Sequence, residues 1–208
     1  MTRERTRRIW YLVLVGFVAL TLVSGLIALQ PYGTPLNWLV RGAATLGYLA
    51  IFLAIISSAY MRQLARFFGR PFIQLHHILS VTGLVMVTLH PLGVAWSNAS
   101  LRVWLPRLDS WLAFLEWGGS PAWCLIAAAS SAAVLRKAIG RNWRAMHLLN
   151  YGAFLLGTAH AIMIGTDFQR IIVRVVTIAL VLALAVVVTP IQKRFQRRRR
   201  QDSANFDT

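Results

Sequence analysis

Five histidines fall inside two strongly apolar stretches of this chain, residues 72–94 and residues 145–164. They are His76, His77, His90, His147 and His160. Each stretch holds a pair of histidines about four helical turns apart, near the two ends of a helix that would cross a bilayer. Because ionisable side chains are costly inside a membrane, histidines confined to two such stretches indicate a functional site.

Neutral imidazole is a strong ligand of haem iron, and two imidazoles on facing helices can clamp one haem. If the two stretches run in parallel, His76 faces His147 near one membrane surface and His90 faces His160 near the other. The rise from His76 to His90 is about 21 Å, most of the hydrocarbon thickness. Two stacked haems would carry electrons across the membrane. An imidazole proton relay and plain hydrogen bonding between helices remain as alternatives.

In residues 72–94, the helical period places two histidines where they could bind haem. His76 and His90 are 14 residues apart and lie within about 40° of the same helix face. Gly83 lies between them, where a flat macrocycle could approach the backbone. His77 is 13 residues from His90 and competes with His76 as the inner ligand.

The second stretch fits less simply. His147 and His160 are 13 residues apart, which turns them about 140° from each other on an ideal helix. We therefore expect either a distorted helix, at Gly152 or Gly157, or haems reached from different flanks of the helix.

The composition predicts an all-α, polytopic membrane protein. Of 208 residues, 57% are hydrophobic and 13% are charged, about half the charged share of a soluble domain. The single cysteine excludes an intrachain disulfide and a thiolate metal cluster. No phosphate-binding loop, serine-hydrolase elbow, zinc-protease or dinucleotide-binding motif is present.

Six membrane spans are expected, and together they form one transmembrane domain over residues 9–189. The spans are residues 9–30, 37–60, 72–94, 122–135, 145–164 and 171–189. Residues 1–8 form a basic tail, and residues 190–208 form a second tail that is basic and then polar. We expect the bundle to hold its haem sites between the third and fifth spans.

The basic residues predict the orientation. With the N-terminus in the cytoplasm, the four inner segments hold four, three, four and six lysines and arginines, 17 of the 22 in the chain. This bias predicts a cell-membrane protein with both termini cytoplasmic. It also accounts for the net charge of +16 through topology and anionic lipid, without nucleic acid.

The longest connection, residues 95–121, has leucines and tryptophans at helical spacing and predicts one or two amphipathic turns, with Pro106 breaking the run. We expect these turns to lie in the membrane interface. A cover over the outer ends of the histidine helices is the alternative.

The segment RKAIGRNWRAMHLLNYGAFLLGTAH places a basic loop before Trp143, His147, Tyr151 and His160. Together with His76 and His90, it resembles the ferric reductase-like transmembrane domain over about Leu36–Thr189. That superfamily includes ferric reductases, NADPH oxidases and the haem-binding subunit of periplasmic methionine-sulfoxide reductase.

The resemblance implies six helices, two b-type haems and outward electron flow. Carried over, the axial ligands are His76 with His147 for the inner haem and His90 with His160 for the outer haem, with Tyr151 packed beside the haem. The 14- and 13-residue spacings are those of the oxidase and ferric-reductase branches.

Two departures qualify the resemblance. The methionine-sulfoxide branch tends to have arginine where His76 and His77 stand. Ferric reductases and NADPH oxidases continue into a flavin and nicotinamide domain, which this chain does not. Electrons would therefore come from a separate flavoprotein, bound FMN or a quinol.

We therefore expect an oxidoreductase component that carries electrons from a cytoplasmic donor to ferric iron, oxygen or a periplasmic oxidoreductase. The haem-binding subunit of a methionine-sulfoxide reductase is one alternative. A haem-free membrane anchor or assembly subunit is another. A proton or solute transporter is disfavoured, because no internal repeat and no intramembrane acid is evident.

Overall fold

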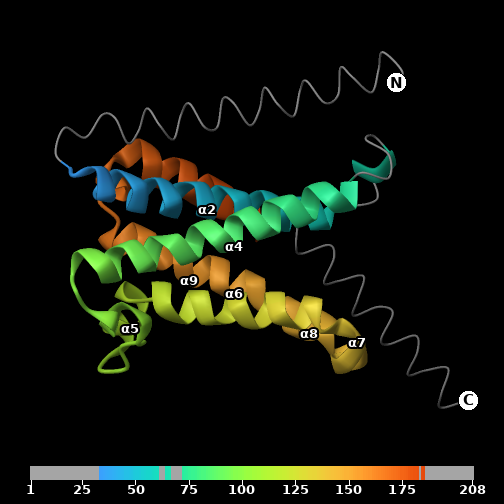
Figure 1. The fold of residues 1–208 in the computed structure, drawn as a ribbon. Helices are drawn as coiled ribbons and strands as arrows, with labels where there is room; N and C mark the ends of the chain where they lie inside the picture. The colour runs from blue at the N-terminus through green and yellow to red at the C-terminus, as the bar shows by residue number, and fades with distance from the viewer. Residues whose placement is uncertain (1–32, 61–63, 67–71, 183, 186–208) are drawn as a thin grey trace, which may run out of the picture.

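The computed structural model describes residues 33–60, 64–66, 72–182 and 184–185 (Figure 1). These residues form helices and connecting turns with no strand, which confirms the all-α prediction. The predicted first span at residues 9–30, both tails and residues 186–189 of the sixth span lie outside the described residues. The described part of the sixth span is the helix Ile171–Leu182, with residues 184–185 also helical.

Two long helices form one half of the bundle. Helix α2, Pro35–Ala59, begins with Thr34, whose side chain accepts a hydrogen bond from the Asn37 backbone N–H. Helix α4, Phe72–Ser97, lies against α2 along much of its length (Figure 1). Within them, residues 35–58 and 74–97 are each long and apolar enough to cross a membrane.

Glycine allows the backbones of α2 and α4 to approach closely. A Cβ added at Gly47 would lie 2.8 Å from Val87 Cγ1 and 3.0 Å from the Val87 backbone nitrogen. A Cβ at Gly83 would lie 2.8 Å from Ile51 Cγ1. Small residues at helix contacts are how membrane helices gain van der Waals packing.

We expect Gly47→Ala to lower the free energy of unfolding in detergent by about 1–3 kcal/mol, because the added methyl overpacks a contact with backbone. The better helix propensity of alanine, about 1 kcal/mol, offsets only part of this. Gly152→Ala is the matched control, since its Cβ would meet only Leu125 Cδ1 at 3.7 Å. Equal stability of the two variants would contradict this account.

The third span is longer than the predicted residues 72–94. Helix α4 continues through Pro91 and Gly93 to Ser97. Proline removes one backbone hydrogen bond from a helix but is tolerated where neighbouring helices support the backbone. Here the stretch is flanked by α2, because a Cβ at Gly93 would overlap the Val40 side chain.

The second half begins with helix α6, Gly119–Val134, followed by α7, Arg136–Ile139, a short 3₁₀ turn, and α8, Trp143–His147. The chain bends by 82° between residues 119–134 and 136–147. Helix α9, Leu149–Ile164, then packs along α6. The described residues hold two full-length candidate spans, or three if the bent pair is one span, compared with the six predicted.

The connection between the halves contains two short helices separated at Pro106, as expected. They are the 3₁₀ helix η1, Leu101–Trp104, and α5, Trp111–Glu116. The apolar side chains here are turned outward: Leu101 is 75% exposed and Trp111 is 74% exposed. Their placement in the membrane interface stays a prediction.

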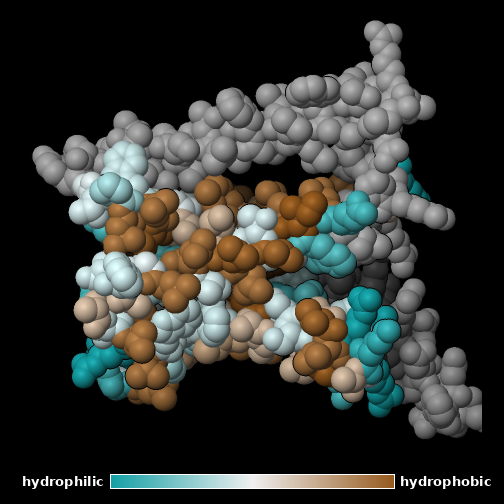
Figure 2. Space-filling view, viewed as in Figure 1, coloured by the Kyte–Doolittle hydropathy of each residue, from teal (hydrophilic) through white to brown (hydrophobic). Residues whose placement is uncertain are grey.

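The core lies where α2, α6 and α9 meet. Its buried members are Ile51, Phe52, Ile55, Ile126, Ala153, Phe154 and Leu184. Figure 2 shows apolar side chains across the middle of the face in view and hydrophilic ones towards its ends. This distribution suits helices surrounded by lipid, and the apolar helices suggest a membrane protein.

Candidate functional site

Two of the three histidines of α4 are held by backbone carbonyls of α2. His76 Nδ1 lies 3.1 Å from the Ala54 oxygen and 3.4 Å from Ser57 Oγ, so the carbonyl is the nearer partner. His90 Nδ1 lies 3.1 Å from the Val40 oxygen. Both rings are therefore oriented by main-chain atoms of the neighbouring helix.

The two histidines of α8 and α9 have the same kind of partner. His147 Nδ1 lies 3.3 Å from the Ala129 oxygen in α6, with the Asn150 amide nitrogen at 3.4 Å. His160 Nδ1 lies 2.7 Å from the Glu116 oxygen. Glu116 ends α5, and the last carbonyls of a helix lack intrahelical partners, so this oxygen is available to the imidazole.

A carbonyl oxygen only accepts hydrogen bonds, so each Nδ1 that is bonded to one carries the proton. In a neutral imidazole the lone pair then lies on Nε2. This tautomer is the one that a metal-ligating histidine adopts when its second nitrogen is bonded to a carbonyl. The donor set thus fits axial ligation of haem iron through Nε2 at all four positions.

The residues whose carbonyls hold the histidines are spaced along the chain like the histidines themselves. Val40 and Ala54 are 14 residues apart, like His76 and His90. Glu116 and Ala129 are 13 residues apart, like His147 and His160. Each histidine helix therefore runs antiparallel to a supporting segment, and the same local arrangement occurs at both depths.

The histidines lie on helices that pack against different partners. His76 and His90 are on α4, whereas His147 is on α8 and His160 is on α9. Among the described elements, α4 packs mainly on α2 and α9 mainly on α6. The pairing of His76 with His147 and of His90 with His160 stays a prediction.

The distortion expected in the fifth span is present, but its predicted position is wrong. Helix α9 runs without interruption through Gly152 and Gly157. The break lies at Leu148, between α8 and α9 and immediately after His147. The Leu148 backbone keeps right-handed helical angles, with φ −66° and ψ −16°.

Three other predicted site residues have different surroundings. Gly83 packs against Ile51 of α2, so its missing side chain serves helix packing and not the approach of a macrocycle. Tyr151 packs against the buried core cluster. His77 is exposed, and its ring centroid lies 6.0 Å from that of His76.

The sequence did not single out Gly119, the first residue of α6. A Cβ added there would lie 3.0 Å from His160 Nε2 and 3.2 Å from both Cδ2 and Cε1. Nearly equal distances to three ring atoms place this Cβ over the ring face, so the in-plane lone pair of Nε2 stays clear. The sequence gives little indication of this role, because many glycines lie at the start of a helix.

The ion pair between Arg41 and Asp167 was also not predicted from the sequence. The Arg41 guanidinium makes two hydrogen bonds to the Asp167 carboxylate, one of them Nε–Oδ2 at 3.0 Å. Their side chains are 14% and 15% exposed. An arginine within a predicted span was the available signal, because such a residue is costly without a partner.

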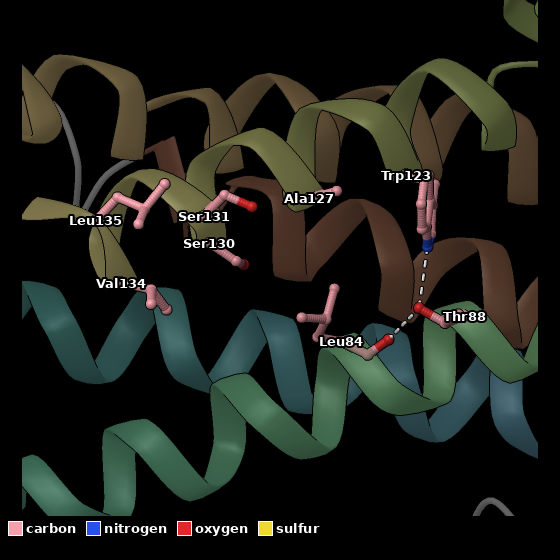
Figure 3. A pocket seen from close by; sticks show the side chains of 8 residues that line it. All are labelled: Leu84, Thr88, Trp123, Ala127, Ser130, Ser131, Val134 and Leu135. Carbon is pink, nitrogen blue, oxygen red and sulfur yellow. Dashed lines mark hydrogen bonds between the residues drawn. The ribbon is translucent and has the colours of Figure 1, made fainter. Parts of the chain in front are cut away.

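A pocket of about 480 Å³ lies between α4 and α6, beside the histidine helices (Figure 3). Figure 3 shows the Trp123 indole N–H donating to Thr88 Oγ1 at 2.9 Å, and that hydroxyl donating to the Leu84 carbonyl at 2.7 Å. Ser130, which follows the Ala129 carbonyl partner of His147, also lines it.

Among the described residues, no group of three or more histidine, cysteine or carboxylate side chains is placed to hold a metal ion. No protein-family model, curated protein or solved structure matches the chain.

Proposed function

We propose that this chain is a membrane protein that binds two b-type haems and carries electrons from one side of the membrane to the other. The observation that carries the proposal is the shared state of the four histidines. Each Nδ1 lies within hydrogen-bond distance of a backbone carbonyl, to which it would donate, and within the part of the chain that the structure describes no Nε2 of the four makes a hydrogen bond.

The proposed architecture is a six-helix bundle in the cell membrane with both termini in the cytoplasm. The basic segments described above support this orientation. Helix α9 has 16 residues and spans about 24 Å, and the preceding α8 adds to the apolar length. In this arrangement, His76 and His147 are the inner ligands, and His90 and His160 are the outer ligands.

The protein contributes orientation and a dry environment. The carbonyls of α2, α5 and α6 fix the tautomer of each imidazole and raise its basicity as a ligand. The buried core beside the histidines excludes water. Haem iron held by paired imidazoles supplies one-electron transfer, while the protein sets its potential through ligands, hydrogen bonds and burial.

The electron donor and the electron acceptor would bind at opposite ends of the two proposed haem sites. Four basic residues, Arg136, Lys137, Arg141 and Arg144, lie on or beside the bent segment that carries His147. A flavoprotein, FMN or a quinol would supply electrons on this side. Ferric iron, oxygen or a periplasmic oxidoreductase would accept them near His90 and His160.

The visible spectrum of the purified protein tests the proposal. We expect b-type bands on reduction with dithionite and about two haems per chain by the pyridine haemochrome assay. The control is a variant in which His76, His90, His147 and His160 are all alanine, and it should lack these bands. A wild-type protein that shows no reduced bands after expression with added haem would refute the proposal and favour a haem-free anchor.

A further inference from the structure

Helix α2 contacts α4, which carries His76 and His90, and also α9, which carries His160. Its carbonyls at Val40 and Ala54 hold His90 and His76 of α4. Other side chains of α2 contact α9 and the turn after it. Since α4 and α9 are not among the closely packed helix pairs of the described residues, α2 is a direct structural link between their histidines.

The outermost of these contacts is the ion pair between Arg41 and Asp167. Arg41 follows Val40, the carbonyl partner of His90. Asp167 begins the 3₁₀ helix η3, Asp167–Gln169, only seven residues beyond His160. The ion pair therefore ties the backbone that holds one outer histidine to the segment that follows the other.

Two further contacts follow along α2 towards the inner side. The Tyr48 hydroxyl lies 2.9 Å from Thr158 Oγ1, and its ring stacks on Phe154 with centroids 4.8 Å apart. Nearer the inner end, Tyr151 packs against the buried cluster that includes Phe52 and Ile55 of α2, and Tyr151 is one helical turn from His147. The three contacts thus lie near the outer pair, between the pairs and near the inner pair.

We propose that these contacts set the distance between the paired imidazoles, with Arg41 and Asp167 as positioning residues for the outer pair. This inference rests on the proposed function, because it assigns the contacts a role towards haem. None of these residues is proposed as a ligand. Each acts through the helix that carries a ligand.

The outer contact should be the most sensitive of the three. Both charges are mostly shielded from solvent, so removal of one partner leaves the other charge without compensation in a poorly hydrated place. Arginine binds a carboxylate through two parallel hydrogen bonds, a geometry that lysine cannot reproduce. Arg41→Lys should therefore retain charge but lose part of the positioning.

The test compares Asp167→Asn and Arg41→Lys in the full chain, with haem content and a potentiometric titration of the visible spectrum as readouts. We expect Asp167→Asn to weaken haem retention at the outer site about 10-fold, the usual scale for loss of a residue that orients a metal ligand. The inner haem should be unchanged. Arg41→Lys should give an intermediate outer-site loss.

Asp109→Asn is the matched control, because Asp109 pairs with Arg107 at an exposed position, with the Arg107 Nε–Oδ2 distance at 2.7 Å. It should leave both haems unaffected. If Asp167→Asn alters neither haem, or alters both equally, the inference is wrong while the proposed function stands. Absence of haem from the wild-type protein would instead remove the proposed function itself.

Discussion

Replacement of His90 or His160 by alanine is expected to remove the outer haem and leave the inner haem bound. Each replacement deletes one of the two proposed axial ligands of the outer haem, so its iron keeps only one bond to the protein. The pyridine haemochrome assay should fall from about two haems per chain to about one. The remaining haem should titrate as a single component in a potentiometric experiment.

The reciprocal variant, His147→Ala, should remove the inner haem and spare the outer one. His77→Ala is the control on the same helix, since its side chain is exposed and makes a ring contact with His76. It should retain both haems. Equal loss of both haems from His90→Ala would contradict the pairing of His90 with His160.

Substitution of Gly119 by alanine should perturb the outer site almost as strongly, although Gly119 is not a ligand. The new Cβ would lie 3.0 Å from His160 Nε2 and 3.2 Å from two further ring atoms. The ring cannot simply retreat, because its Nδ1 is held 2.7 Å from the Glu116 carbonyl. The imidazole plane should therefore tilt, and we expect about 10-fold weaker haem retention at the outer site.

Electron paramagnetic resonance of the oxidised protein checks this tilt, because the spectrum of low-spin haem depends on the relative orientation of its two imidazole planes. Only the outer-haem signal should change. Gly157→Ala is the matched control on α9, where the nearest atom to a new Cβ is Ala122 Cβ at 4.0 Å. An unchanged outer haem in Gly119→Ala would show that the ring face is not in close contact.

The helices could be predicted from the sequence because they depend on local patterns. Apolar composition indicated the helices, and the 14-residue spacing of His76 and His90 placed them on one face. The depth of each histidine in the membrane was inferred from the alternation of spans and the positions of basic residues. The pairing of His76 with His147 and of His90 with His160 stays a prediction.

The contacts that orient the histidines could not be predicted, because they join residues far apart in the chain. Arg41 and Asp167 are 126 residues apart, and His90 bonds to a carbonyl 50 residues away. The break at Leu148 has no proline or glycine at that residue to mark it. Gly83 suggested a close approach correctly, but a glycine does not reveal whether the approaching group is a helix or a cofactor.

The use of carbonyl acceptors has a consequence for how this chain tolerates mutation. Every residue type offers the same main-chain oxygen, so a side-chain replacement at Val40, Ala54 or Ala129 need not remove the bond that orients a histidine. A one-residue insertion or deletion within α2 would instead rotate one acceptor by about 100° relative to the other. Related chains are thus free to diverge in identity at these positions while the length of the intervening segment is kept.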